Sequence, residues 1–92
     1  MMLPLVWLEE ALDDLESIID FIEVQNPSAA ERIGRAIRDT AAQLPYHPYM
    51  HRSGRVPGTR EALVTPNYLI VYRIDIDSID ILAIRHTRQQ YP

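Results

Sequence analysis

Apolar residues follow two different spacings along this chain of 92 residues. The chain begins with a short apolar run from Leu3 to Trp7, which favours a strand. After this run, apolar residues return at helical spacing as far as Gln25, at positions Ala11, Leu15, Ile18, Ile19 and Ile22. Because this spacing places them on one helical face, the pattern predicts a helix directly after the first strand.

A second helix is predicted after Asn26 and Pro27. Asparagine is a good N-cap, and proline is tolerated at the first helical position. Glu31 with Arg35, and Arg35 with Asp39, stand at i,i+4 and would each add about a few tenths of a kcal/mol. Because the connection is short, the two helices should lie antiparallel as a hairpin. The apolar face of the second helix comprises Ala30, Ile33, Ile37, Ala41 and Leu44.

The second half of the chain predicts a loop and then three strands. Three prolines and two glycines in residues 45–58 exclude a helix or a central strand, and Gly54 and Gly58 fit turns. The segments REALVT (60–65), YLIVYRIDI (68–76) and SIDILAIRH (78–86) are rich in β-branched and aromatic residues. Short connections make them an antiparallel meander. The predicted fold is therefore α+β, with a helical hairpin covering one face of the sheet, in one domain spanning 1–92.

The charge is distributed unevenly along the chain. Residues 1–26 carry seven acids and no base, whereas residues 27–92 carry nine arginines against six acids, and the net charge is −4. Lysine is absent, which excludes a lysine general base. The acids of the first helix favour a solvated face, with a surface for a basic partner as the alternative.

Several classes of protein are excluded or disfavoured by composition. The absence of cysteine excludes disulfides, thiolate nucleophiles and cysteine-type zinc sites. His47 and His51 lie four residues apart, but no acid or cysteine lies near them, so we expect neither a metal nor another cofactor. The sequence has no apolar run long enough to span a bilayer and no basic leader, so we expect a cytoplasmic protein without membrane contact.

Some conspicuous side chains have simple structural interpretations. Arg73 lies within a predicted strand, where it could pair with Glu61 or Asp75 or serve a function. The large aromatic residues are expected to pack in the core and on the sheet, namely Trp7, Phe21, Tyr68 and Tyr72.

The order of motifs resembles a known family. WLxxALDDLxxIIxFIxxxNPxAAxRI is followed by LPxHPY, GRVPGTRE, PNYLIVYRI and the closing RHTRQQYP, and together they cover nearly the whole chain. This order is similar to the ParE branch of the RelE/ParE superfamily, the toxins of bacterial type II toxin-antitoxin modules. The resemblance implies the fold predicted above and a cognate antitoxin as partner, through which alone the toxin would reach operator DNA.

The resemblance implies two alternative targets. RelE-like and YoeB-like toxins cleave messenger RNA on the ribosome, and for that chemistry His86 could move a proton, Arg85 and Arg88 could hold phosphate, and Tyr91 could stack on a base. RelE-like enzymes use lysines, which this chain lacks, and Leu69 stands where YoeB-like enzymes place a catalytic arginine. The negative net charge also disfavours binding among ribosomal phosphates.

The ParE alternative is the poisoning of DNA gyrase, which needs a contact surface rather than an acid-base pair. The resemblance assigns toxicity to the C-terminal segment, here carried onto Arg85, His86, Arg88 and Tyr91. We expect six arginines to lie away from the acidic helix, with several converging on one end of the sheet, namely Arg52, Arg55, Arg60, Arg73, Arg85 and Arg88. An acidic antitoxin segment would favour this arginine edge. A module that binds antitoxin without toxicity remains a third alternative.

Overall fold

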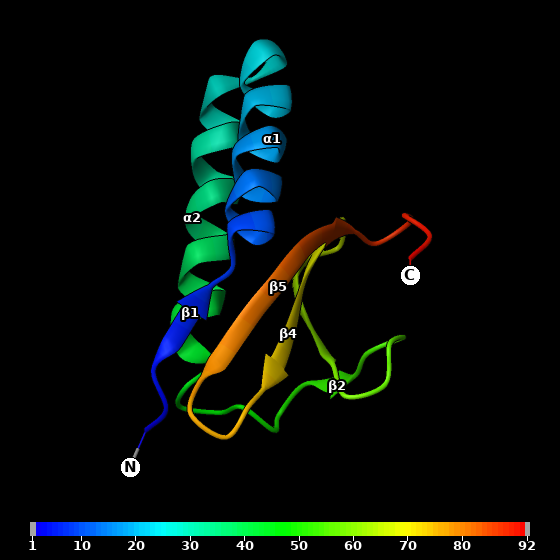
Figure 1. Cartoon of the computed structure of the whole chain (residues 1–92). Helices are drawn as coiled ribbons and strands as arrows, with labels where there is room; N and C mark the ends of the chain where they lie inside the picture. Colours follow the sequence, from blue (N-terminus) through cyan, green and yellow to red (C-terminus); the bar gives the residue numbers. More distant parts are fainter. Residues whose placement is uncertain (1, 92) are drawn as a thin grey trace.

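The computed structural model describes residues 2–91 as two helices and five strands in one sheet (Figure 1). The elements follow the order β1 (Leu5–Trp7), α1 (Glu9–Gln25), α2 (Pro27–Gln43), β2 (Arg52–Ser53), β3 (Arg60–Thr65), β4 (Tyr68–Ile74) and β5 (Ile79–His86). This confirms the predicted α+β class. No helix within residues 2–91 is long and apolar enough to cross a membrane.

The second helix of the hairpin begins at the predicted residues, Asn26 and Pro27. The Asn26 side chain accepts a hydrogen bond from the Ala29 N–H at 3.0 Å, and Pro27 occupies the first helical position. The two helices approach closely at Gly34, where a Cβ atom would lie 3.0 Å from the Ile19 Cδ1 atom. Of the predicted ion pairs, Glu31 and Arg35 meet at 2.7 Å, whereas Arg35 and Asp39 form no ion pair within the described chain.

The hairpin covers one face of the sheet, but its Asn26 end extends beyond it (Figure 1). Near this end Phe21 is 69% exposed and Val24 is 87% exposed. The prediction that Phe21 packs in the core is therefore wrong, because the hairpin reaches past the sheet at this end and leaves the side chain largely in solvent. Among the other aromatic residues, Tyr72 is fully buried and Trp7 and Tyr68 are half-buried.

The main core lies between the hairpin and the sheet. It joins Ala11 and Leu15 of α1 and Ile37 and Ala41 of α2 to the sheet residues Ala62, Ile70, Tyr72, Ile79, Ile81 and Ile84. The Tyr72 hydroxyl donates to the Pro48 carbonyl at 2.6 Å, which fixes the loop that follows α2 against the sheet.

The sheet is mixed rather than purely antiparallel, in the order β1-β5-β4-β3-β2. The strands β3, β4 and β5 form the predicted antiparallel meander, but β1 pairs in parallel with β5, Leu5 opposite Ile79. A parallel pair needs a long connection, and the helical hairpin and the meander supply it. The predicted loop contains a two-residue strand, β2, which forms the edge of the sheet opposite β1. Ile76 lies outside β4 in an exposed turn, so the predicted strand ends two residues too late.

We predict that Ile37→Ala destabilises the chain by about 3 kcal/mol, because the side chain is fully buried and its removal leaves a cavity. Urea unfolding followed by circular dichroism measures the change. Val24→Ala, at an exposed position of the same hairpin, is the control and should change the free energy of unfolding by less than about 0.5 kcal/mol. Equal effects of the two substitutions would contradict this assignment of the core.

Candidate functional site

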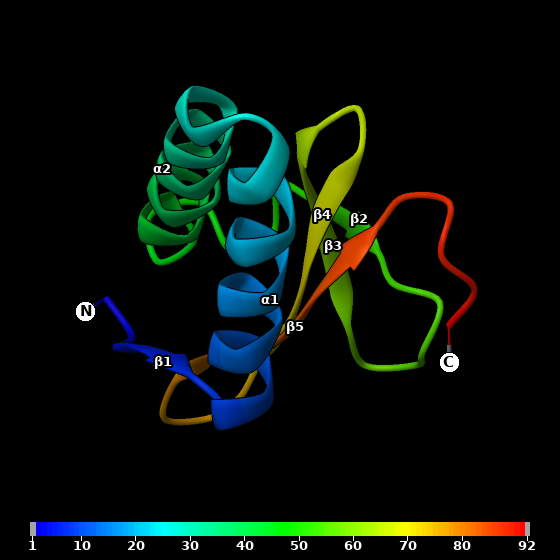
Figure 2. The same cartoon turned by 90° about the horizontal axis from the view of Figure 1, so that it is seen from above.

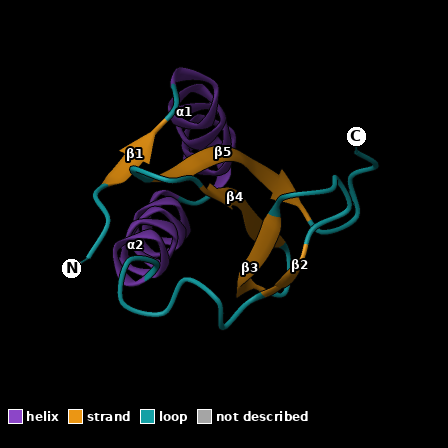
Figure 3. Cartoon of the chain, turned by 60° about the horizontal axis from the view of Figure 1, so that its bottom comes forward, coloured by secondary structure: helices purple, strands orange, loops and turns teal. Residues whose placement is uncertain are grey.

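The face of the sheet opposite the helices, called the open face below, carries a second and smaller apolar cluster. Leu69, Val71 and Ala83 are buried there, and Leu82 and Tyr91 pack against them. Figure 3 shows the C-terminal segment on the side of the sheet away from both helices. The cover over this cluster therefore comes from the end of the chain rather than from a helix.

The C-terminal tail, residues 87–91, is held at its base by the turn between β3 and β4. The Thr87 N–H donates to the Asn67 carbonyl at 2.8 Å, and the Thr87 hydroxyl donates to the Pro66 carbonyl at 2.9 Å. The Gln89 N–H then donates to the His86 carbonyl at 2.9 Å. Figure 2 shows the tail beside the loop that follows β2. These bonds turn the chain so that Tyr91 reaches the open face.

Four side chains form a cluster on the open face that we call the Glu61 clasp: Arg52, Arg55, Glu61 and Tyr91. Glu61, on β3, is only 4% exposed and accepts a hydrogen bond from the Tyr91 hydroxyl. The Arg52 Nη2 atom lies 2.9 Å from its Oε1 atom, and the Arg55 Nε atom lies 3.6 Å from its Oε2 atom. Arg55 also covers the Tyr91 ring at 4.4 Å and donates to the Gln89 carbonyl at 2.9 Å.

The clasp sets the protonation states of its two acidic groups. Burial alone would raise the pKa of Glu61, but the hydrogen bonds from Tyr91 and Arg52 outweigh it and hold the pKa below the ordinary value of 4.5. Burial and the hydrogen bond to Glu61 raise the pKa of Tyr91 to about 12. At neutral pH the carboxylate is therefore charged and a weak base, and the phenol stays protonated.

Arg85, a predicted contact residue, is held against the acidic helix. Its Nη1 atom lies 2.7 Å from the Asp14 Oδ2 atom, and its Nη2 atom lies 3.4 Å from the Glu10 Oε1 atom. Asp14 also accepts the Ile84 N–H at 3.0 Å, beyond the point where β1 stops pairing with β5. The expectation that the arginines lie away from the first helix is wrong for Arg85, because Asp14 binds the edge of β5.

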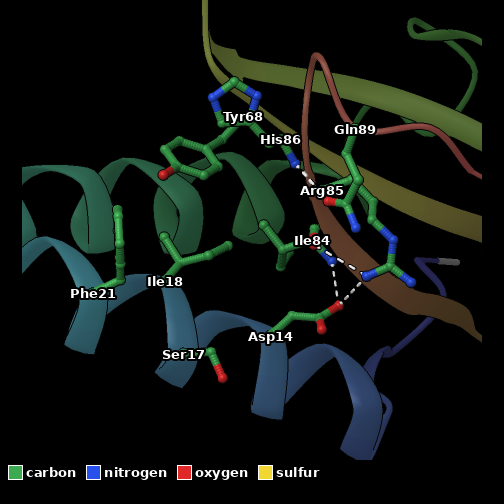
Figure 4. Close-up of a pocket in the computed structure, with 9 residues that line it drawn as sticks. All are labelled: Asp14, Ser17, Ile18, Phe21, Tyr68, Ile84, Arg85, His86 and Gln89. Atoms are coloured by element: carbon green, nitrogen blue, oxygen red, sulfur yellow. Dashed lines mark hydrogen bonds and ion pairs between the residues drawn. The ribbon is translucent and has the colours of Figure 1, made fainter.

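A groove opens between α1 and the end of β5 (Figure 4), with a volume of about 270 Å³. Ile18, Phe21 and Ile84 give it an apolar wall, and Tyr68 and His86 meet edge to face at 5.4 Å at its other side. Such a groove can accept an apolar side chain from a partner. It is lined by Asp14, Ser17, Ile18, Phe21, Tyr68, Ile84, Arg85, His86 and Gln89.

The remaining candidate arginines do not form one cluster. Arg60 donates to the His51 carbonyl at 2.7 Å and lies 5.1 Å from the Tyr49 ring centroid, so it fixes the loop before β2. Arg73 pairs with Asp80 at 2.9 Å, rather than with either of the two acids expected from the sequence. Arg88 is exposed and makes no ion pair within residues 2–91.

His86 lies at the end of β5 and is bonded to the tail. The Nδ1 atom of its ring accepts a hydrogen bond from the Arg88 backbone N–H at 3.1 Å. The His86 backbone N–H donates to the Gln89 side-chain oxygen at 3.3 Å. Leu69 is fully buried.

The relatives of this chain are bacterial toxins. The family model described as the ParE toxin of the type II toxin-antitoxin system, parDE, matches residues 5–91. The chain is 37% identical over 87 residues to the putative toxin Y4kP of Sinorhizobium fredii, covering 94% of this chain and 90% of that one. It is 34% identical over 85 residues to toxin RelE2 of Caulobacter vibrioides, covering 92% and 96% of the two chains.

Solved structures agree with these relatives. A chain of the chromosomal ParDE system from P. aeruginosa superposes with a TM-score of 0.82 at 26% identity, with 92% of this chain and 96% of that one covered. A chain of the RelBE2 toxin-antitoxin complex from Mycobacterium tuberculosis gives a TM-score of 0.68 at 24% identity, covering 94% and 99%, and so supports the fold alone.

The fold and the relatives define a toxin of a bacterial type II toxin-antitoxin system. Within that class, the chain belongs to the ParE toxin family, as the motifs of its sequence indicated.

The sequence did not lead us to the two acids that organise the site, Glu61 and Asp14, although the surroundings of Glu61 in the sequence indicate its role. It is the only acid in residues 40–74, a segment that also carries Arg52, Arg55, Arg60 and Arg73. A lone carboxylate among arginines is a natural centre for ion pairs. Asp14 left no such signal, because it is one of seven acids near the start of the chain.

We predict that Asp14→Ala destabilises the chain by about 2 kcal/mol, because it removes the acceptor of the Ile84 N–H and the nearer of the two acids that pair with Arg85. Chemical denaturation measures the loss. The control is Asp13→Ala, which removes an exposed acid from the same helical turn and should change stability by less than about 0.5 kcal/mol. If both substitutions cost the same, the role of Asp14 at the strand edge is wrong.

A second prediction concerns the pH dependence of stability. The pKa of Glu61 is lowered in the folded chain, so its stabilisation is present above the ordinary value of 4.5 and is lost as the pH falls through the lowered pKa. The stability difference between the wild type and Glu61→Gln should therefore be larger at pH 7 than at pH 3. Urea titrations at both pH values measure it, and a difference independent of pH would contradict the charged, hydrogen-bonded state of Glu61.

Proposed function

We propose that this chain arrests growth by binding DNA gyrase as a ParE-type toxin, and that a cognate antitoxin neutralises it. The observation that carries the proposal is the position of the C-terminal tail. The tail presents the exposed Arg88 beside His86, while the clasp behind it fixes the chain through the buried Glu61. Arginine is favoured in interfaces because its guanidinium makes several hydrogen bonds and packs on aromatic rings.

The chemistry of the tail also favours binding over catalysis. A carboxylate with a lowered pKa and a phenol with a pKa of about 12 exchange protons poorly at neutral pH. Leu69 occupies the place where the resemblance to YoeB-like nucleases would put a catalytic arginine, and its side chain is buried. An inhibitor that acts by binding needs none of these groups, and gyrase would be met in the cytoplasm.

Ribosome-dependent cleavage of messenger RNA is the second candidate. The relationship to toxin RelE2 favours it, since that toxin shares 34% identity over 92% of this chain. In that case His86, Arg88 and Tyr91 would belong to the nuclease site, with Arg85 held by Asp14 behind them. Purified protein is therefore tested in parallel in a gyrase supercoiling and cleavage assay and on ribosomes carrying a defined messenger. Codon-specific cuts with unaffected gyrase would overturn the proposal.

We predict that Arg88→Ala weakens gyrase inhibition about tenfold, a loss of about 1.4 kcal/mol, because arginine is enriched among the few interface residues that carry most of the binding energy. Arg32→Ala is the matched control, because Arg32 is also exposed and unpaired within the described residues but lies on α2. Inhibition by the Arg32 variant should equal that of the wild type.

His86→Ala separates contact from catalysis. If the tail acts by contact, this variant should keep most of its inhibition while the Arg88 variant loses it. Complete loss of activity in a folded His86 variant, with Arg88→Ala unaffected, would contradict a contact role and favour proton transfer by the imidazole.

A further inference from the structure

The C-terminal tail is held to the sheet by several separate contacts. Tyr91 packs its ring on the apolar cluster of the open face and directs its hydroxyl to Glu61. Arg55 holds the tail at two further points, the Tyr91 ring and the Gln89 carbonyl, while its own Nε atom faces Glu61. The bond from Tyr91 to Glu61 and the bond from Arg55 to Gln89 join residues 30 and 34 positions apart.

Glu61 is the common partner within this arrangement. Its carboxylate is almost fully buried and binds Tyr91 through one oxygen and Arg52 through the other. Leaving a buried carboxylate without partners costs free energy. This cost fixes its three partners in position, namely Arg52, Arg55 and Tyr91. Between the two anchored ends of the tail, Thr87 on the Pro66 turn and Tyr91 on Glu61, lies Arg88.

We infer that Glu61 is a positioning residue for toxicity: through Tyr91 and Arg55 it holds the C-terminal tail so that Arg88 faces the target. The inference rests on the proposed function, because it says how the contact surface of that function is held in place. Glu61 itself touches no target. Its loss should free the tail while the main core between the helices and the sheet stays intact, because that core lies on the other face.

Two variants test the clasp, Glu61→Gln and Tyr91→Phe. The first removes the charge that holds both arginines, and the second removes a single hydroxyl and keeps the ring on the apolar cluster. Because Tyr91→Phe is so small a change, it remains informative if the Glu61 variant folds poorly. The controls are Asp80→Asn, a buried carboxylate paired with Arg73, and Tyr72→Phe, which loses a hydroxyl bonded to Pro48 on the other face.

The first readout is ¹⁵N relaxation of the tail. In the wild type we expect the Arg88 and Gln89 amides to be as ordered as the sheet, with order parameters of about 0.8, falling below about 0.6 in both clasp variants. The controls should leave these amides ordered. Unchanged tail order in Glu61→Gln and Tyr91→Phe would overturn the inference.

The second readout is growth arrest on induced expression at matched protein levels. We expect the clasp variants to need about tenfold more protein than the wild type for the same arrest. The control variants should keep full arrest even where their melting temperatures fall as far, which separates positioning from a general loss of stability. Full arrest by clasp variants with a mobile tail would overturn the inference.

A double variant tests whether Glu61 acts through Tyr91. If it does, Glu61→Gln combined with Tyr91→Phe should be no less toxic than the more impaired single variant, whereas independent effects would multiply and contradict the mechanism. Because growth arrest reports toxicity whatever the target, a negative gyrase assay would reject the proposed target and leave this test intact. A wild type without growth arrest would reject both.

Discussion

The burial of one carboxylate organises the half of the molecule that faces away from the helices. Removing a charged group from water costs several kcal/mol unless partners replace the lost hydration. Glu61 obtains those partners from the β2 segment, from the loop after it and from the last described residue of the chain. The order of the open face therefore follows from an electrostatic requirement, whereas the order of the opposite face follows from apolar packing.

The sequence predicted the elements well because each has a local cause. Asn26 and Pro27 divide the helices by capping and backbone geometry, and the β-branched runs specify the meander. The parallel pairing of β1 with β5 could not be predicted, since it joins segments more than 70 residues apart. The exposure of Phe21 was missed for a related reason: large aromatic side chains are usually buried, but the residue type does not say how far the sheet extends beneath the helix.

The candidate site was predicted only in part. The tail was identified from the resemblance, and Tyr91 and Arg55 do meet. Arg60, Arg73 and Arg85 were grouped with them because their charge is visible in the sequence, but each finds a separate partner: backbone carbonyls, Asp80 and Asp14. Pairing depends on register and side-chain direction, which sequence alone does not fix. The acids decide which arginines stay free, and so they determine the surface as much as the arginines do.

The outer edge of β5 affects how readily separate copies of the chain aggregate. Beyond Ile81 no strand pairs with this outer edge, and an open edge of this kind attracts strands from other molecules. Here its donors are already occupied, the Ile84 N–H by Asp14 and the His86 N–H by Gln89. A strand from a second copy would first have to displace both side chains. This edge is thereby protected against edge-to-edge aggregation during the interval after synthesis and before the chain meets any partner.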